Sequence, residues 1–144
     1  MNIASLLATK GDMVVTVRAE QTIRDALRLL ARHNIGALVV VDDDHLPVGI
    51  VSERDVVRAA SRDEHLFAHP VSAIMTSDVI VGVPHDDLMT VGITMTERRI
   101  RHLPVVHQGR LVGIVSIGDV LKAERDRYRG EVDTLQILIL GEGA

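Results

Sequence analysis

The chain has 144 residues, is 47% hydrophobic and carries 16 basic against 20 acidic side chains, a formal charge of −4. This apolar content excludes intrinsic disorder and suffices for one domain or two small halves. Because the charge is negative and only Phe67 and Tyr128 are aromatic, the composition disfavours nucleic-acid binding by charge or by base stacking. The absence of cysteine excludes disulfides, thiolate metal sites and a thiol nucleophile.

Two further features concern location. No apolar run approaches the roughly 18 residues that a membrane span needs. The N-terminal residues have neither the charged start nor the long apolar stretch of a signal peptide. We therefore expect a cytoplasmic protein without a membrane anchor.

The first half of the chain predicts a strand, a helix, a β-hairpin and a second helix. Apolar residues at helical spacing follow Ile23, and a continuous apolar run at 37–41 is typical of a strand buried on both faces. A polar turn then separates this run from a second short apolar strand. The expected elements are a strand at 14–17, a helix from Ile23, strands at 37–41 and 48–51, and a helix beginning at Ser52.

The second half repeats this pattern. Residues 49–52 (GIVS) recur as residues 113–116, a shift of 64 residues, and each copy has an acidic residue three positions after its serine. The expected elements are a strand at 79–83, a helix around 88–95, strands at 103–106 and 111–115, and a helix beginning at Ser116. Matches in the same order along both halves indicate an internal duplication.

The duplication predicts three segments: a first repeat at 1–66, a second repeat at 67–123 and a tail at 124–144. Gly130 is expected to break or kink the last helix. The apolar run that follows, 132–140, fits either a helix or a strand. Because this run is too apolar to stay in water, we expect it to cover the core or a subunit interface.

The repeated hairpin, which ends in Gly-apolar-apolar-Ser followed by an acid three residues later, resembles the CBS domain. The matching segments are 49–55, 74–76, 99–106 and 113–119, and the likeness covers roughly residues 3–123. Two copies in register resemble a tandem pair, or Bateman module, of the free-standing type. The resemblance implies an α/β fold of two β-α-β-β-α repeats packed with pseudo-two-fold symmetry, each a small sheet with two helices.

The resemblance also implies a regulatory module for signal transduction rather than an enzyme. CBS pairs bind AMP, ADP, ATP, NAD or S-adenosylmethionine between their repeats and are commonly homodimers, so such a ligand, a second copy and a regulated protein partner are expected here. No nucleophile–base set or catalytic motif is visible. Among the seven histidines, His65 and His69 are four residues apart, but they lie in the connector and lack a third ligand, so no metal site is expected. The alternative function is a structural module for dimerisation or partner docking whose clefts stay empty.

Two interpretations of Ser52 and Asp55, and of their counterparts Ser116 and Asp119, remain open. A serine followed three residues later by an acid is a helix capping box, which is a purely structural role. The same helix N-terminus also suits phosphate, and a carboxylate there can accept hydrogen bonds from ribose hydroxyls. Arg54 is either a solvated helix residue or a phosphate ligand.

The family pattern implies two different clefts. It assigns Asp55 and Asp119 to ribose, the two serines to ribose or phosphate, and residues 101–102 to phosphate, whereas Gly36 and Ala37 let adenine lie against the backbone. In this pattern Asp55 faces Thr76, Val81, Arg101 and His102, and Asp119 faces Val15, Gly36 and Ala37.

Overall fold

The computed structural model describes residues 1–142, in which two similar sets of elements follow one another. The first set comprises β1 (Thr16–Arg18), α2 (Ile23–His33), β2 (Ala37–Val41), β3 (Pro47–Ser52) and α3 (Glu53–Ala60). The second comprises α4 (Leu88–Arg98), β4 (His102–His107), β5 (Arg110–Ser116) and α5 (Ile117–Glu142). A helix, α1 (Ile3–Lys10), precedes both sets, and two 3-10 turns, η1 (Leu66–Ala68) and η2 (Val71–Ala73), lie between them. The predicted α/β fold with two small sheets is confirmed.

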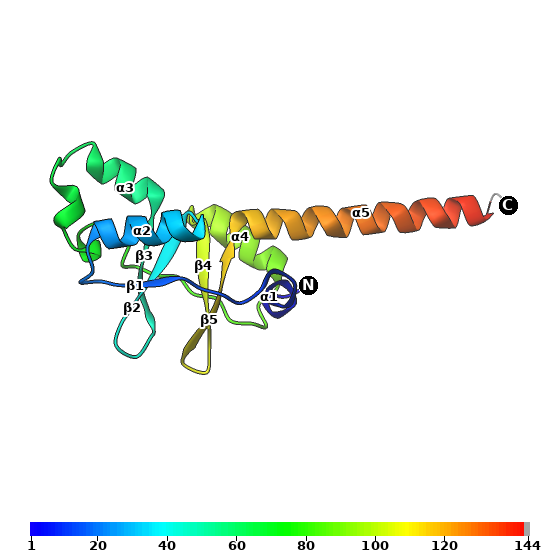
Figure 1. The fold of residues 1–144 in the computed structure, drawn as a ribbon. Coiled ribbons are helices and arrows are strands. Elements are labelled where there is room, and N and C mark those ends of the chain that lie inside the picture. The colour runs from blue at the N-terminus through cyan, green and yellow to red at the C-terminus, as the bar shows by residue number, and fades with distance from the viewer. Residues whose placement is uncertain (143–144) are drawn as a thin grey trace.

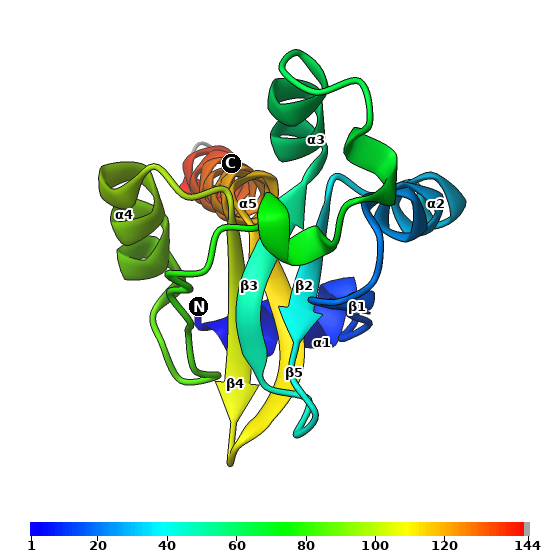
Figure 2. The same ribbon diagram turned by 90° about the vertical axis from the view of Figure 1, so that its left-hand side faces the viewer.

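The strands form two sheets whose hairpins stand side by side (Figure 1). In the first sheet β1 runs parallel to β2, with Val17 opposite Val40, and β3 runs antiparallel to β2. The second sheet is the antiparallel hairpin β4–β5. All five residues of β2 are buried, as their continuous apolar run predicts. Helices α2 and α4 flank the strands on opposite sides (Figure 2).

The strand predicted at 79–83 is wrong. Only Gly82 pairs there, as a single parallel bridge with Val105. The valines on either side of it, Val81 and Val83, are 44% and 46% exposed, and Pro84 cannot donate a hydrogen bond that would continue a ladder. The counterpart of β1 is thus reduced to one bridge in the second repeat.

The core of each half contains residues from a segment outside that half's own set of elements. Ile3 and Leu6 of α1, a helix that the sequence analysis did not predict, belong to the core of the second half with Leu88 and Met95. Conversely, Val71 of η2 belongs to the core of the first half. Each core is therefore completed by a segment that precedes the other half in the chain, which ties the two halves together. The repeat boundaries 1–66, 67–123 and 124–144 come from the sequence pattern and stay a prediction.

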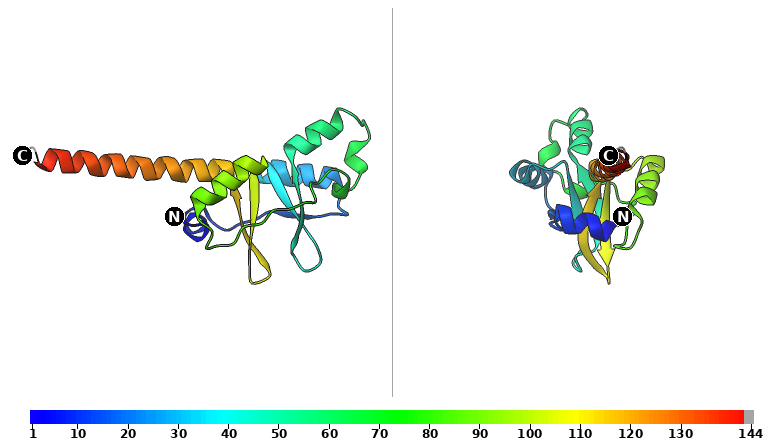
Figure 3. Two further views of the ribbon diagram at one scale, coloured as in Figure 1. Left: turned by 180° about the vertical axis from the view of Figure 1, so that it is seen from behind. Right: turned by 90° about the vertical axis from the view of Figure 1, so that its right-hand side faces the viewer.

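Helix α5 is continuous to Glu142, so the prediction that Gly130 interrupts it is wrong. Of the two positions predicted for the apolar run 132–140, covering the core is wrong, because the run is exposed, and covering a subunit interface stays a prediction. One glycine lowers helix stability by only about 1 kcal/mol, which flanking residues absorb. Figures 1 and 3 show α5 leaving the body as a straight rod. The apolar side chains of its outer part are between 49% and 73% exposed: Val132, Leu135, Ile137, Leu138, Ile139 and Leu140. None of the helices within residues 1–142 has the length and apolar content to cross a membrane.

Candidate functional site

A cavity of about 870 Å³ lies beside Asp55, and both halves of the chain contribute to its wall. Its charged and polar lining residues are Ser52, Glu53, Arg54, Asp55, Arg58, Thr76, Asp78, Arg99, Arg101 and His102. Gly36 and five aliphatic residues, Ile50, Val57, Val79, Ile80 and Ile100, complete the wall. We call this cavity the Asp55 cleft.

The N-terminus of α3 opens into the Asp55 cleft and carries the predicted capping box. The Ser52 amide and hydroxyl donate to Oδ2 of Asp55 at 2.8 and 3.0 Å, and the Asp55 amide donates to Oγ of Ser52 at 3.3 Å. The capping interpretation is therefore correct as geometry. All contacts to the carboxylate use Oδ2, and Oδ1 has no hydrogen bond within residues 1–142. Asp55 can cap the helix and still accept hydrogen bonds from a ligand.

Four arginines outnumber the three carboxylates of the cleft wall, Glu53, Asp55 and Asp78, and leave it with a net positive charge. Arg54 and Arg58 lie one turn apart on α3, and Arg99 and Arg101 lie between α4 and β4. Guanidinium groups bind phosphate through paired N–H donors. Sequence reasoning missed Arg58 and Arg99; the spacing of four residues from Arg54 was the available signal for Arg58, since such residues share a helix face.

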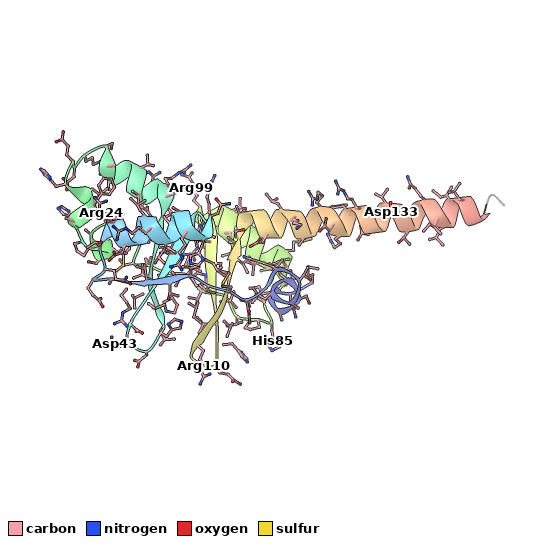
Figure 4. The ribbon with its side chains drawn as sticks, viewed as in Figure 1. Arg24, Asp43, His85, Arg99, Arg110 and Asp133 are labelled. Atoms are coloured by element: carbon pink, nitrogen blue, oxygen red, sulfur yellow. The ribbon has the colours of Figure 1, made fainter. Side chains whose placement is uncertain are left out.

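Arg99 reaches the cleft through an unusual backbone conformation. It caps the C-terminus of α4 in the left-handed region, with φ 56°, as Asn34 does after α2 with φ 52°. Asparagine tolerates this region well and arginine does not. Figure 4 shows Arg99 where the two halves meet. The second repeat thus accepts local strain at an arginine that lines the cavity.

The linker between the halves enters the cleft by pairing with the edge of β3. The Ile50 amide donates to the Thr76 carbonyl at 2.9 Å, and the Thr76 amide returns a bond to the Ile50 carbonyl at 2.8 Å. Glycine at position 49 permits this approach without a shift, because a Cβ there would lie 2.6 Å from Sδ of Met75 and 3.2 Å from the Thr76 oxygen. The pairing places Thr76 and Asp78 at the cavity wall.

His102 is half-buried at the cleft. Burial lowers its pKa below the ordinary value of 6.5, and the positive charge of Lys10 lowers it further. The imidazole is consequently neutral near pH 7, so it offers the cleft one donor and one acceptor rather than a positive charge.

The counterpart carboxylate, Asp119, has an internal partner. Ser116 and Asp119 repeat the two backbone-to-side-chain bonds of Ser52 and Asp55, at 2.9 and 3.0 Å. In addition, Nζ of Lys10 donates to Oδ2 of Asp119 at 2.5 Å and to the Ile114 carbonyl at 2.7 Å. Burial opposes ionisation of Asp119, but the hydrogen bonds from Lys10 and Ser116 outweigh it and lower the pKa. The two equivalent acids therefore differ in their partners: Asp119 is bonded to a lysine, and Asp55 is not.

The position of α1 explains why Lys10 reaches Asp119. Leu7 covers Gly113 of β5 just as Met75 covers Gly49 of β3, with 2.7 and 2.6 Å from an added Cβ to the nearest side-chain atom. The helix that carries Leu7 ends at Lys10, one turn further on, beside the carboxylate.

The structure brings some of the predicted site residues together and separates others. The Asp55 cleft holds Ser52, Arg54, Asp55, Thr76, Arg101, His102 and Gly36, although the family pattern placed Gly36 with Asp119. Val15 is half-buried against the first core, Ala37 is buried in β2, and Val81 lines a separate hollow of about 250 Å³ beside α4. Residues 1–142 contain no cluster of three His, Cys, Asp or Glu side chains that could hold a metal.

The comparisons with known proteins identify the family. The CBS domain model matches residues 11–62 and 71–126, and the chain belongs to the CBS domain family. It is 35% identical over 117 residues to the CBS domain-containing protein YhcV of Bacillus subtilis, which covers 81% of this chain and 83% of YhcV. Tandem CBS pairs of this size are generally regulatory rather than catalytic.

Two solved structures are similar in fold as well as in sequence. The CBS-domain containing protein ATU1752 of Agrobacterium tumefaciens superposes with a TM-score of 0.81 at 40% identity, over 86% of this chain and 99% of that one. The CBS domain protein PAE2072 of Pyrobaculum aerophilum, whose structure is a complex with AMP, superposes with a TM-score of 0.73 at 32% identity, over 83% and 89%.

Proposed function

We propose that this chain is a sensor that binds one adenine nucleotide, of the AMP, ADP, ATP or NAD type, in the Asp55 cleft and passes the signal on through the arrangement of its two halves. The observation that carries the proposal is the unoccupied Oδ1 of Asp55 at a helix N-terminus, facing a cavity with four arginines. The AMP complex of PAE2072, a relative with the same fold, supports it.

Each part of a nucleotide has a matching surface in the cleft. Asp55 accepts hydrogen bonds from the ribose hydroxyls, and Ser52 lies beside them. The guanidinium groups of Arg54, Arg58 and Arg101 bind phosphate. The base packs against aliphatic side chains such as Val57 and Ile100, because the described lining contains no Phe, Tyr or Trp. This cationic wall favours phosphorylated ligands over S-adenosylmethionine, which carries a sulfonium charge.

Signalling follows from the position of the cleft between the halves. A ligand that touches both α3 and the segment 99–102 stabilises the arrangement in which these elements are close. We propose that the chain acts as a homodimer in the cytoplasm and that a protein partner reads this arrangement.

Isothermal titration with AMP, ADP, ATP, NAD and S-adenosylmethionine tests the proposal. We expect one ligand per chain by titration. Chemical denaturation at a hundred times the dissociation constant is expected to show an increase in unfolding free energy of about 2.7 kcal/mol. Uridine monophosphate serves as the control for binding by phosphate alone. If none of the adenine compounds binds, or if the uridine compound binds equally well, the proposal is refuted.

The alternative is a structural module in which Asp55 only caps α3 and the exposed end of α5 docks a partner. The exposed apolar side chains of α5 favour this second function. The two functions differ in one measurement: the structural module dimerises or binds its partner with no adenine compound bound and shows no change when one is added.

A further inference from the structure

A stripe of apolar side chains runs along α5 from the body to the far end of the helix. Leu121, Tyr128, Val132, Leu135 and Ile139 are separated by 7, 4, 3 and 4 residues. This is the spacing of the a and d positions of a heptad, in which Val132 and Ile139 occupy a and the other three occupy d. Arg125 occupies the remaining a position.

The stripe is distinct from the face with which α5 packs on the body. Val120 belongs to the core of the second half, with Ile117 and Ala123 packed against it, whereas the neighbouring Leu121 is 63% exposed. Along the stripe, Tyr128, Leu135 and Ile139 are 60%, 58% and 67% exposed. Figure 4 shows the segment around Asp133 far from the rest of the molecule. The stripe is therefore free for another chain to cover.

The charges that flank the stripe select the partner and its direction. With Leu121 at d, Glu124 and Glu131 occupy g, and Lys122 and Arg129 occupy e. In a parallel pair of identical helices, each g residue faces the e residue five positions later on the partner, so Glu124 faces the partner's Arg129. In an antiparallel pair, g faces g and e faces e, which opposes like charges. Within residues 1–142 Arg129 has no ion-pair partner, whereas Glu124 contacts Arg127 of its own helix at 3.1 Å and exchanges this contact for the partner's Arg129.

We propose that two copies of this chain pair through α5 as a parallel, in-register, two-stranded coiled coil. Valine and isoleucine at a with leucine at d suit two strands, and a single polar residue at a, here Arg125, holds the register. Leu138 at a g position flanks the seam. The family model ends at residue 126, so most of this surface lies beyond the matched CBS domains. The inference rests on the proposal that the chain acts as a homodimer.

Analytical ultracentrifugation of the full chain over a wide concentration range tests the pairing. Leu135→Asp places a charge in the seam and is expected to raise the dimer dissociation constant about 100-fold or more. Ile137→Asp is the matched control, because Ile137 is 69% exposed on the same helix but lies at f, outside the seam. Circular dichroism checks that both variants fold. A monomeric wild type, a wild-type tetramer or equal loss in both variants overturns the proposal.

Single cysteines test the direction, because the natural chain has none. Arg125→Cys and Ile139→Cys are each expected to form a disulfide between two copies of the same variant. A pair in which neither variant crosslinks with itself is not parallel and in register, and this outcome overturns the proposal. Nucleotide titration of Leu135→Asp separates this failure from a failure of the sensor function, since binding at the Asp55 cleft does not require α5 to be paired.

Discussion

The sharpest prediction compares Asp55→Ala with Asp119→Ala. Both carboxylates accept a hydrogen bond from the amide of a serine three residues earlier, at 2.8 Å for Ser52 and 2.9 Å for Ser116. The two acids differ in their remaining partner: Asp119 is bonded to Lys10, whereas Asp55 faces the open cleft. The pair of variants therefore separates helix capping from ligand binding.

The capping contribution sets the expected loss of stability. Removing a capping side chain costs about 1 kcal/mol, with a range of about 0.5–2 kcal/mol, so both variants are expected to unfold at a temperature about 4 °C lower. Asp119→Ala also loses an ion pair whose side chains are 30% and 23% exposed, which adds about 1 kcal/mol at most. Asp119→Ala is thus expected to be the less stable variant.

Only Asp55→Ala is expected to lose affinity for the nucleotide. Asp55→Ala removes an ionised acceptor from the ribose hydroxyls, and hydrogen bonds to charged groups are worth about 1.5–3 kcal/mol each. We expect the affinity for the best adenine nucleotide to fall about 30-fold or more in Asp55→Ala and to change little in Asp119→Ala.

Chemical denaturation measures the stability of each variant, and isothermal titration measures its affinity. Equal stability losses with unchanged affinity in both variants would refute the reasoning and assign Asp55 to capping alone. A larger loss of affinity in Asp119→Ala would place the ligand in the other half of the molecule.

Three further predictions concern groups around the two acids. Lys10→Met removes the internal cation from Asp119, and titration is expected to show that a second nucleotide binds each chain, more weakly than the first. Unchanged stoichiometry would mean that Lys10 does not prevent binding beside Asp119. The pKa of His102 is lowered in the folded chain, so as the pH decreases the unfolded chain binds a proton first. The free energy of unfolding should therefore fall below about pH 6.5. Urea denaturation at several pH values should show a smaller fall for His102→Gln. Gly49→Ala forces a Cβ to within 2.6 Å of Sδ of Met75 and is expected to cost about 1–3 kcal/mol of unfolding free energy, whereas a cost near zero would show that Met75 moves aside.

Much of the fold was predictable because it depends on local pattern. The duplicated GIVS segment, the helical spacing after Ile23 and the buried run of β2 each arise from neighbouring residues. The Ser52–Asp55 capping box was predictable for the same reason, since its bonds join residues three apart. By contrast, the strand expected at 79–83 fails because Val81 and Val83 have no core to enter on either side of Gly82.

The sequence by itself determined the two repeats, their order of elements and the acid at the start of each second helix. Only the tertiary structure decided that α1 packs on the second half, that Lys10 therefore meets Asp119, and that Arg58 and Arg99 share one cleft with Asp55. Lys10 and Asp119 are 109 residues apart, and no periodicity of the chain encodes a contact over that distance. The physical reason is that helices and caps are stabilised by neighbours in sequence, whereas a site between two repeats depends on which segment covers which core.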